Sequence, residues 1–263
     1  MMATNHGGVP PGLKLVMLLA AFFGMASALG ASYGMERVWE KRFSLPPGGQ
    51  VTVENVHGSI WVEGWDRAEV EAFVVMRSPR PTDRLDDVQV AVEARSTSVA
   101  FHTLYPGNLD GPVRVDYHLR VPRQVRLEQL STLEGGIAVR DVEGAVQARS
   151  LHGDIEEVNV AGSVVARALT GNIRVSLRAL PAPQLPVRLE TLNGNLDLLL
   201  PAQANADLEL STLAGKVLGA YTWQASSVPG DSTRRARLGQ GGVRVELRTV
   251  RGNIRVSQRD DDL

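Results

Sequence analysis

The fold of this chain is decided by residues 128–175, which read EQLSTLEGGIAVRDVEGAVQARSLHGDIEEVNVAGSVVARALTGNIRV. Glycines recur in this stretch at intervals of nine residues: Gly135, Gly144, Gly153, Gly162 and Gly171. When each glycine is numbered zero, aliphatic residues stand mainly at positions −7, −5, −2 and +2, and often at +4. A short fixed period of this kind is typical of repeat architectures, in which each unit packs on the next.

The parity of these positions predicts a corner in every unit. Positions −7 and −5 share one face of a strand, whereas −2, +2 and +4 have the opposite parity. A slip of one residue would turn the later side chains outward unless the chain bends there, and glycine permits a sharp bend. We therefore expect a strand, a corner and a second strand, with all the aliphatic positions, −2 included, pointing inward.

Two units form a coil of eighteen residues, so residues eighteen apart should stack as ladders. The expected ladders are Leu133 with Leu151 and Leu169, Ile137 with Ile155 and Ile173, Val142 with Val160, Val146 with Val164, and Ala148 with Ala166.

Further copies of the motif surround this stretch at wider spacing. Their glycines are Gly58, Gly194, Gly215 and Gly252, which complete the predicted set of structural turn glycines. Residues 65–127 lack the tight repeat, but their apolar and polar residues alternate, which favours longer antiparallel strands. The sequence thus predicts an all-β fold: a β-solenoid, or single-stranded β-helix-like stack, with antiparallel strands in the N-terminal half.

The N-terminal segment predicts export. Lys14 precedes the apolar run 15–25, and Ala26-Ser27-Ala28 has the small residues of a signal-peptidase site. Residues 1–28 are therefore expected to be a signal peptide or, if uncleaved, an N-terminal membrane anchor. The β domain is expected at residues 37–258, followed by an acidic tail at 259–263. The chain contains no cysteine, which excludes disulfides and a lipoprotein anchor.

The charge balance gives no reason to expect nucleic acid as a partner. The chain has 28 basic and 29 acidic residues, and only 5% of its residues are aromatic. No net positive field would attract a polyanion, and few rings are available for base stacking. Apart from an uncleaved N-terminal segment, nothing indicates contact with a membrane. The expected partner is an envelope polymer or protein.

The titratable residues do not form a recognisable catalytic or metal site. His57 and His152 occupy position −1, where other copies carry varied residues, so both are expected in exposed turns. A metal set of His152, Asp154, Glu156 and Glu157 is disfavoured, because Arg174 lies beside Glu156 in the next coil. A β-helical carbohydrate-active enzyme would need converging carboxylates, and the outward rows have mixed charge. No enzyme activity, cofactor or metal is predicted.

Four residues are candidates for a ligand-binding surface. Trp61 has outward parity and Trp65 follows a turn glycine; each could bind a glycan or cap the open end of the stack. Arg149 and Arg167 occupy the same position in adjacent coils and could form a basic stripe for an anionic envelope polymer.

Two segments resemble a known family. Residues 51–71, VTVENVHGSIWVEGWDRAEVE, are similar to the start of a bacterial putative-adhesin family of unknown function, and residues 238–256, LGQGGVRVELRTVRGNIRV, are similar to its end. The resemblance covers roughly residues 40–258. It implies an exported all-β repeat domain with an adhesin-like binding or scaffold role, and it supplies no catalytic residues. The alternatives are an envelope-stress or signalling ectodomain and a β-helical carbohydrate-active enzyme.

Overall fold

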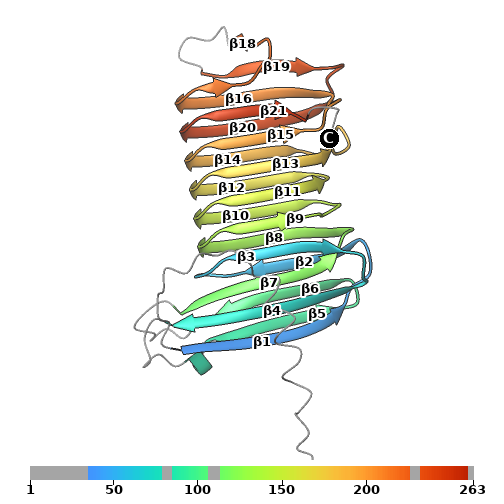
Figure 1. The fold of residues 1–263 in the computed structure, drawn as a ribbon, viewed down its shortest axis with the longest axis vertical. Coiled ribbons are helices and arrows are strands. Elements are labelled where there is room, and N and C mark those ends of the chain that lie inside the picture. The colour runs from blue at the N-terminus through green and yellow to red at the C-terminus, as the bar shows by residue number, and fades with distance from the viewer. Residues whose placement is uncertain (1–34, 79–84, 106–112, 226–231, 260–263) are drawn as a thin grey trace, which may run out of the picture. The chain divides into compact units, whose positions relative to one another are not determined.

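The computed structural model describes residues 35–78, 85–105, 113–225 and 232–259. The predicted signal peptide lies outside the described residues, as does the acidic tail apart from Arg259. The described part of the chain is all-β and folds into two large mixed sheets, with one 3-10 turn at Leu85–Asp87 (Figure 1). One continuous cluster of buried hydrophobic residues forms the core.

The first sheet, here called sheet A, contains ten of the described strands. In spatial order they are β1 (Met35–Ser44), β4 (Glu69–Ser78), β7 (Arg114–Pro122), β3 (Ile60–Trp65), β9 (Ile137–Arg140), β11 (Ile155–Ala161), β13 (Ile173–Ala179), β15 (Leu196–Leu200), β21 (Ile254–Gln258) and β17 (Val217–Leu218).

Sheet B contains eleven of the described strands. In spatial order they are β18 (Gln224–Ala225), β19 (Arg234–Leu238), β16 (Ala206–Ala214), β20 (Val243–Arg251), β14 (Val187–Asn193), β12 (Val164–Thr170), β10 (Val146–His152), β8 (Val125–Glu134), β2 (Gly49–Glu54), β6 (Ser98–Leu104) and β5 (Gln89–Arg95).

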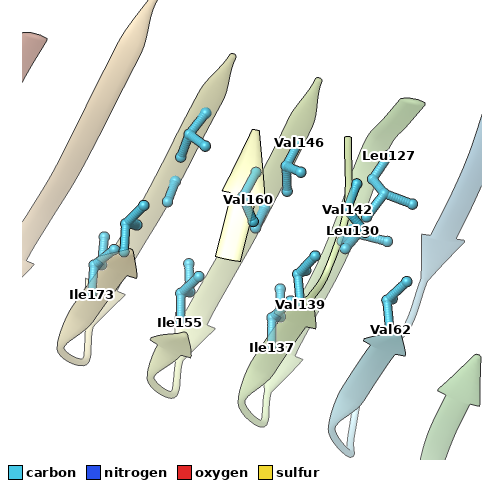
Figure 2. Packing of buried hydrophobic residues seen from close by; sticks show 14 of the residues in the cluster. Val62, Leu127, Leu130, Ile137, Val139, Val142, Val146, Ile155, Val160 and Ile173 are labelled. Carbon is cyan, nitrogen blue, oxygen red and sulfur yellow. The ribbon is translucent and has the colours of Figure 1, made fainter. Parts of the chain in front are cut away.

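The expected register of eighteen residues is confirmed in the tight repeat. The chain passes from one sheet to the other at each glycine, and every strand pairs in parallel with the strand one coil away. Ile155 on β11 pairs with both Ile137 and Ile173 (Figure 2). On β10, Val146 pairs with Val164 and Ala148 pairs with Ala166. We call each sheet B strand, with its corner and the sheet A strand that follows, a rung.

The prediction that position −2 points inward is confirmed for Val142 and Val160, before Gly144 and Gly162, but it is wrong at the corners that follow sheet B strands. Leu133 and Leu169 are 48% and 38% exposed, whereas Thr132 and Ser150 at position −3 are buried. The strand keeps its alternation through −7, −5 and −3, and the phase changes only after −3. A polar residue is tolerated inside because its hydroxyl is paired: Ser150 donates to the carbonyl of Gly135 at 2.9 Å. The leucines are in register, as predicted, but on the outside.

The motif glycines lie at the corners and stack on one another. At Gly153 φ is 156°, and a Cβ there would lie 2.0 Å from the carbonyl oxygen of Gly135. Only glycine fits so close to the neighbouring backbone. Positive φ angles are found at Gly58, Gly135, Gly144, Gly153, Gly162, Gly171, Gly194 and Gly252, and Gly215 is held by the same close approach, its Cβ position lying 1.9 Å from the carbonyl oxygen of Gly252.

A ladder of amides follows the glycines at position +1. The side-chain oxygen of Asp154 accepts the backbone N–H of Asn172 at 2.7 Å, and that of Asn172 accepts the N–H of Asn195 at 2.9 Å. Asn195 and Asn253 continue the row towards Lys216. Each side chain thus supplies an acceptor to the next corner, so the corner backbone is paired although no strand continues there.

Spatial order departs from chain order at both ends. The last rung in the chain, β20–β21, lies between β14–β15 and β16–β17. At the other end, β6 and β7 also pair in parallel with β2 and β3, a pairing that the prediction of antiparallel strands at residues 65–127 does not include. The predicted antiparallel pairing is confirmed for β1 with β4, β4 with β7, and β5 with β6.

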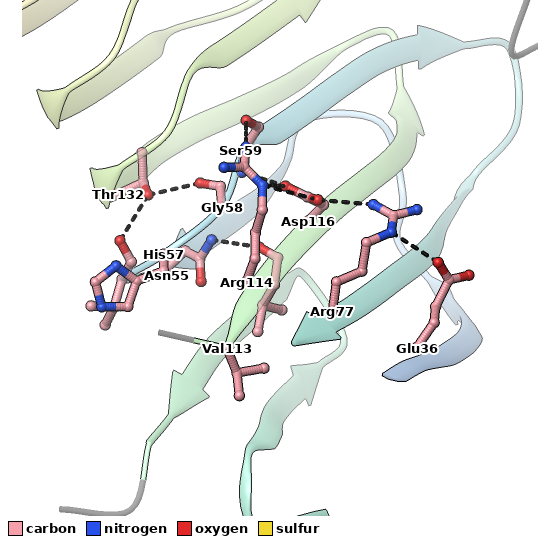
Figure 3. A network of polar contacts seen from close by, with 12 residues as sticks. Glu36, Asn55, His57, Gly58, Ser59, Arg77, Val113, Arg114, Asp116 and Thr132 are labelled. Carbon is pink, nitrogen blue, oxygen red and sulfur yellow. Dashed lines mark hydrogen bonds and ion pairs between the residues drawn. The ribbon is translucent and has the colours of Figure 1, made fainter. Parts of the chain in front are cut away.

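A buried polar network closes the ladders at the β7 end (Figure 3). Asp116 is buried and accepts the N–H of Ser59 at 2.8 Å, the place that Asp154 takes in the amide ladder. Arg77 and Arg114 each lie 3.1 Å from the Asp116 carboxylate and balance its charge. Asn55, at position −3, donates to the carbonyl of Val115 at 2.8 Å. These residues therefore have a structural role.

Candidate functional site

Trp61 lies on the outer face of sheet A and forms an aromatic platform with His118 and Phe73. Its indole is stacked on the imidazole of His118, with centroids 4.4 Å apart and planes 10° apart, and Phe73 lies 6.2 Å from the same imidazole. Burial is the main cause that lowers the pKa of His118, which favours a neutral ring in the stack. Trp61 itself remains 40% exposed.

The side of Trp61 away from His118 faces a small residue and then charged ones. Trp61 pairs with Ala138 on β9, and Ala138 pairs with Glu156 on β11. Glu156 forms an ion pair with Arg140 at 3.6 Å. Because Ala138 has a short side chain, no bulky side chain stands at the paired position between Trp61 and Glu156.

Trp65 lies on the same strand and face, but it is more firmly held. Its Nε1 donates to the carbonyl of Glu69 at 2.8 Å, and the guanidinium groups of Arg67 and Arg120 lie 4.9 and 5.9 Å from its ring. This half-buried indole is engaged by its own neighbours, so Trp61 offers the more available surface.

Arg149 and Arg167 are neighbours, as predicted, but they lie on sheet B and so form no single site with the tryptophans. They are paired in register on β10 and β12. The Arg167 guanidinium is engaged by the Glu190 carboxylate at 2.8 Å. Arg149 makes no ion pair or side-chain hydrogen bond within the described part of the chain, so its charge is available.

Sequence reasoning missed a groove beside these arginines. The outward aliphatic residues at position −2, four of them exposed and Leu151 and Val250 partly exposed, form a line that is here called the leucine row: Leu133, Leu151, Leu169, Leu192, Val250 and Leu213. Between part of this row and the arginine positions runs a groove of about 610 Å³, bordered by Arg149, Leu169, Leu192, Leu213 and Arg248 among others. The sequence contains the signal, because position −2 has the opposite parity to positions −7 and −5. The prediction attributes this parity to a bend in the chain and not to an outward side chain.

The structure separates the residues of the disfavoured metal set. Glu157 is fully buried, while Asp154 is engaged by the backbone of Asn172 and Glu156 lies 3.9 Å from Arg174. No cluster of three or more His, Asp or Glu residues suited to a metal ion occurs among the described residues. His57 lies 3.0 Å from Glu134 at an exposed corner. The described segments include no membrane-spanning helix.

No family model and no curated protein matches the chain. Among solved structures it is similar to a putative cell adhesion protein from Clostridium sporogenes, with 11% identity and a TM-score of 0.48, covering 85% of this chain and 100% of the other. It is also similar to a putative adhesin from Bacteroides fragilis, with 10% identity and a TM-score of 0.41, covering 84% of this chain and 97% of the other. These two solved structures are described as a putative cell adhesion protein and a putative adhesin, and a putative-adhesin family is also what residues 51–71 and 238–256 resemble.

Proposed function

We propose that this chain is a non-catalytic, exported protein of the cell envelope or cell surface, whose β-solenoid serves as an adhesin-like binding scaffold. The stack of parallel rungs supports the solenoid assignment. Its glycine, hydroxyl and amide ladders fix each corner to the next, so side chains on the outer faces are held at regular spacing. Such a frame presents a binding surface without needing a deep pocket.

The observation that carries the proposal is the exposed Trp61 platform. An indole held by a stacked imidazole loses little conformational freedom on binding, and its free surface can pack against the C–H groups of a sugar ring. Glu63 on the same strand, Arg140 on β9 and Glu156 on β11 lie near it and offer hydrogen bonds to hydroxyl groups. The expected ligand is the glycan part of an envelope polymer.

The test uses the full chain immobilised on a support and a polysaccharide fraction from a bacterial envelope. Trp61→Ala is expected to weaken retention about tenfold, because it removes the stacking surface. Leu218→Ala is the matched control, since Leu218 is 37% exposed and lies at the other end of sheet A. Equal retention by both variants, or new reducing ends in the recovered polysaccharide, would count against the proposal.

Export is tested separately. We expect the protein recovered from the envelope or medium of producing cells to begin after Ala28, as determined by mass spectrometry. Recovery of the chain in the cytoplasm with residues 1–28 intact would contradict this part of the proposal.

A further inference from the structure

Aliphatic side chains occupy position −2 in the rungs from β8 to β16, although this position faces solvent. Leu192 and Leu213 are 42% and 76% exposed. Positions −4 and −1 of the same rungs hold residues of mixed chemistry, including serine, arginine, glutamate and histidine. Single exposed leucines need no explanation, but a continuous aliphatic row marks a surface that binds something apolar.

The groove beside the row is narrow and straight. Its two long borders are positions −4 and −2 of the same strands, two residues or about 6–7 Å apart, and Ser232 lies against the groove beside Ser211 of β16. It crosses the rungs of β10, β12, β14, β20 and β16, and neighbouring strands are spaced by about 4.8 Å, so its length is about 19 Å. An α-helix, about 10 Å across, is too wide to enter.

The backbone along the groove is already paired. The strands β10, β12, β14, β20 and β16 are hydrogen-bonded neighbours in sheet B, so the backbone N–H and C=O groups beneath the groove are used between rungs. The hydroxyl groups of Thr191 and Thr249 donate to glycine carbonyls at 3.0 Å. An extended peptide lying here would leave its own amides without partners, which is costly, whereas a hydrocarbon chain needs none.

Charge marks one end of the groove. Arg149 borders the first of the five rungs, and within the described residues its guanidinium has no anionic partner. Arg167 and Arg248, further along, are paired with Glu190 and Glu209. An unpaired guanidinium beside an aliphatic trough suits a carboxylate that leads into a hydrocarbon chain.

We propose that this groove binds a single long-chain fatty acid, with its carboxylate on Arg149 and its chain along Leu169, Leu192 and Leu213. The groove length of about 19 Å exceeds the roughly 15 Å depth of one bilayer leaflet, so it can cover a full acyl chain. A two-chain lipid fits less well, because one trough would leave its second chain in water. The proposal goes beyond the glycan-binding role and uses a different sheet.

The experiment is titration calorimetry of the full chain with palmitate, kept below the concentration at which it forms micelles. One saturable site is expected. The double variant Leu169→Thr/Leu192→Thr should bind at least tenfold more weakly, because two aliphatic contacts are lost. Arg149→Glu should also bind at least tenfold more weakly. Hexadecanol, which has the same chain without the charge, should bind at least tenfold more weakly than palmitate to the unmodified protein.

Two matched controls locate the site. Leu104→Thr removes a leucine that is 50% exposed on β6, and Arg255→Glu reverses an exposed charge on β21; neither residue borders the groove. Both variants should bind palmitate as the unmodified chain does. The absence of saturable binding, or equal losses in the control and groove variants, overturns the proposal. If the unmodified chain does not bind palmitate but still retains envelope polysaccharide, the fatty-acid proposal fails and the proposed function stands.

Discussion

At Gly153 the repeat leaves no room for a side chain. A Cβ there would lie 2.0 Å from the carbonyl oxygen of Gly135, at a φ of 156°. We expect Gly153→Ala to lower the free energy of unfolding by about 3 kcal/mol, because the two rungs must separate. Urea denaturation followed by circular dichroism measures it. Gly136→Ala is the control, since its Cβ would meet only the Asp154 oxygen, at 3.3 Å. Equal losses would contradict the steric explanation.

Glu157 places a carboxyl group in the core with no hydrogen-bond partner among the described residues. It pairs in register with Val139 and Val175, so an aliphatic residue is the norm at this position. Burial raises its pKa from 4.5 to about 8. The folded state therefore keeps a proton that the unfolded state loses, and the stability of the fold falls as pH rises from about 4.5 to about 8.

Replacing this carboxyl group should remove that pH dependence. We expect Glu157→Val to raise the free energy of unfolding at pH 8 by roughly a few kcal/mol. The free energies of unfolding at pH 5 and pH 8 should then differ less than in the unmodified chain. Denaturant titrations at the two pH values measure both effects. Glu156→Val, at the adjacent and partly exposed position, should keep the pH dependence of the unmodified chain. A Glu157→Val protein whose stability still fell between these pH values would refute this account.

At the scale of the strand, the buried hydroxyl row has one gap. Thr132, Ser150, Thr191, Thr212 and Thr249 each donate to a glycine carbonyl of the neighbouring rung. The same position on β12 is Ala168, which has no donor. We expect Ala168→Thr to add about 1 kcal/mol to the free energy of unfolding by donating to the carbonyl of Gly153. Ala168→Val has the same shape without the hydroxyl group, so a thermal melt showing equal gains would argue against the bond.

The sequence allowed the ladders to be predicted at positions whose burial and polarity agree. Ile137, Ile155 and Ile173 are aliphatic and buried, so their spacing located the strands and the register. The prediction failed at positions where burial and polarity disagree. Thr132 is polar but buried, because a backbone carbonyl inside the corner accepts its hydroxyl, and Leu133 is apolar but exposed. Hydrophobicity alone assigns such a pair to the wrong faces.

At the scale of the molecule, the sequence could not predict which rungs are neighbours. Every rung presents the same pattern to the next, so the motif permits several spatial orders. The insertion of β20–β21 beside β14–β15 depends on the path of the chain between Gly215 and Gly252. The candidate site could be predicted only in part for the same reason. Parity indicates that Trp61 points outward, but only the pairing of β3 with β7 shows that His118 lies against it.

This interchangeability predicts what happens when the inserted rung is removed. In a chain ending at Gln240, β20 and β21 are absent, and β16 carries the same aliphatic, threonine and glycine positions that β20 used against β14. We expect β16 to pair directly with β14, which would bring Glu209 opposite Arg188. In the full chain Glu246 lies between them, so their Cα atoms are about 9.6 Å apart, too far for a disulfide.

A disulfide tests this pairing. With Arg188→Cys and Glu209→Cys in this cysteine-free chain, oxidation should crosslink the shortened protein and leave the full one reduced. A shortened protein that forms no crosslink, or that aggregates through the open edges of β14 and β15, would show that the rungs are not interchangeable.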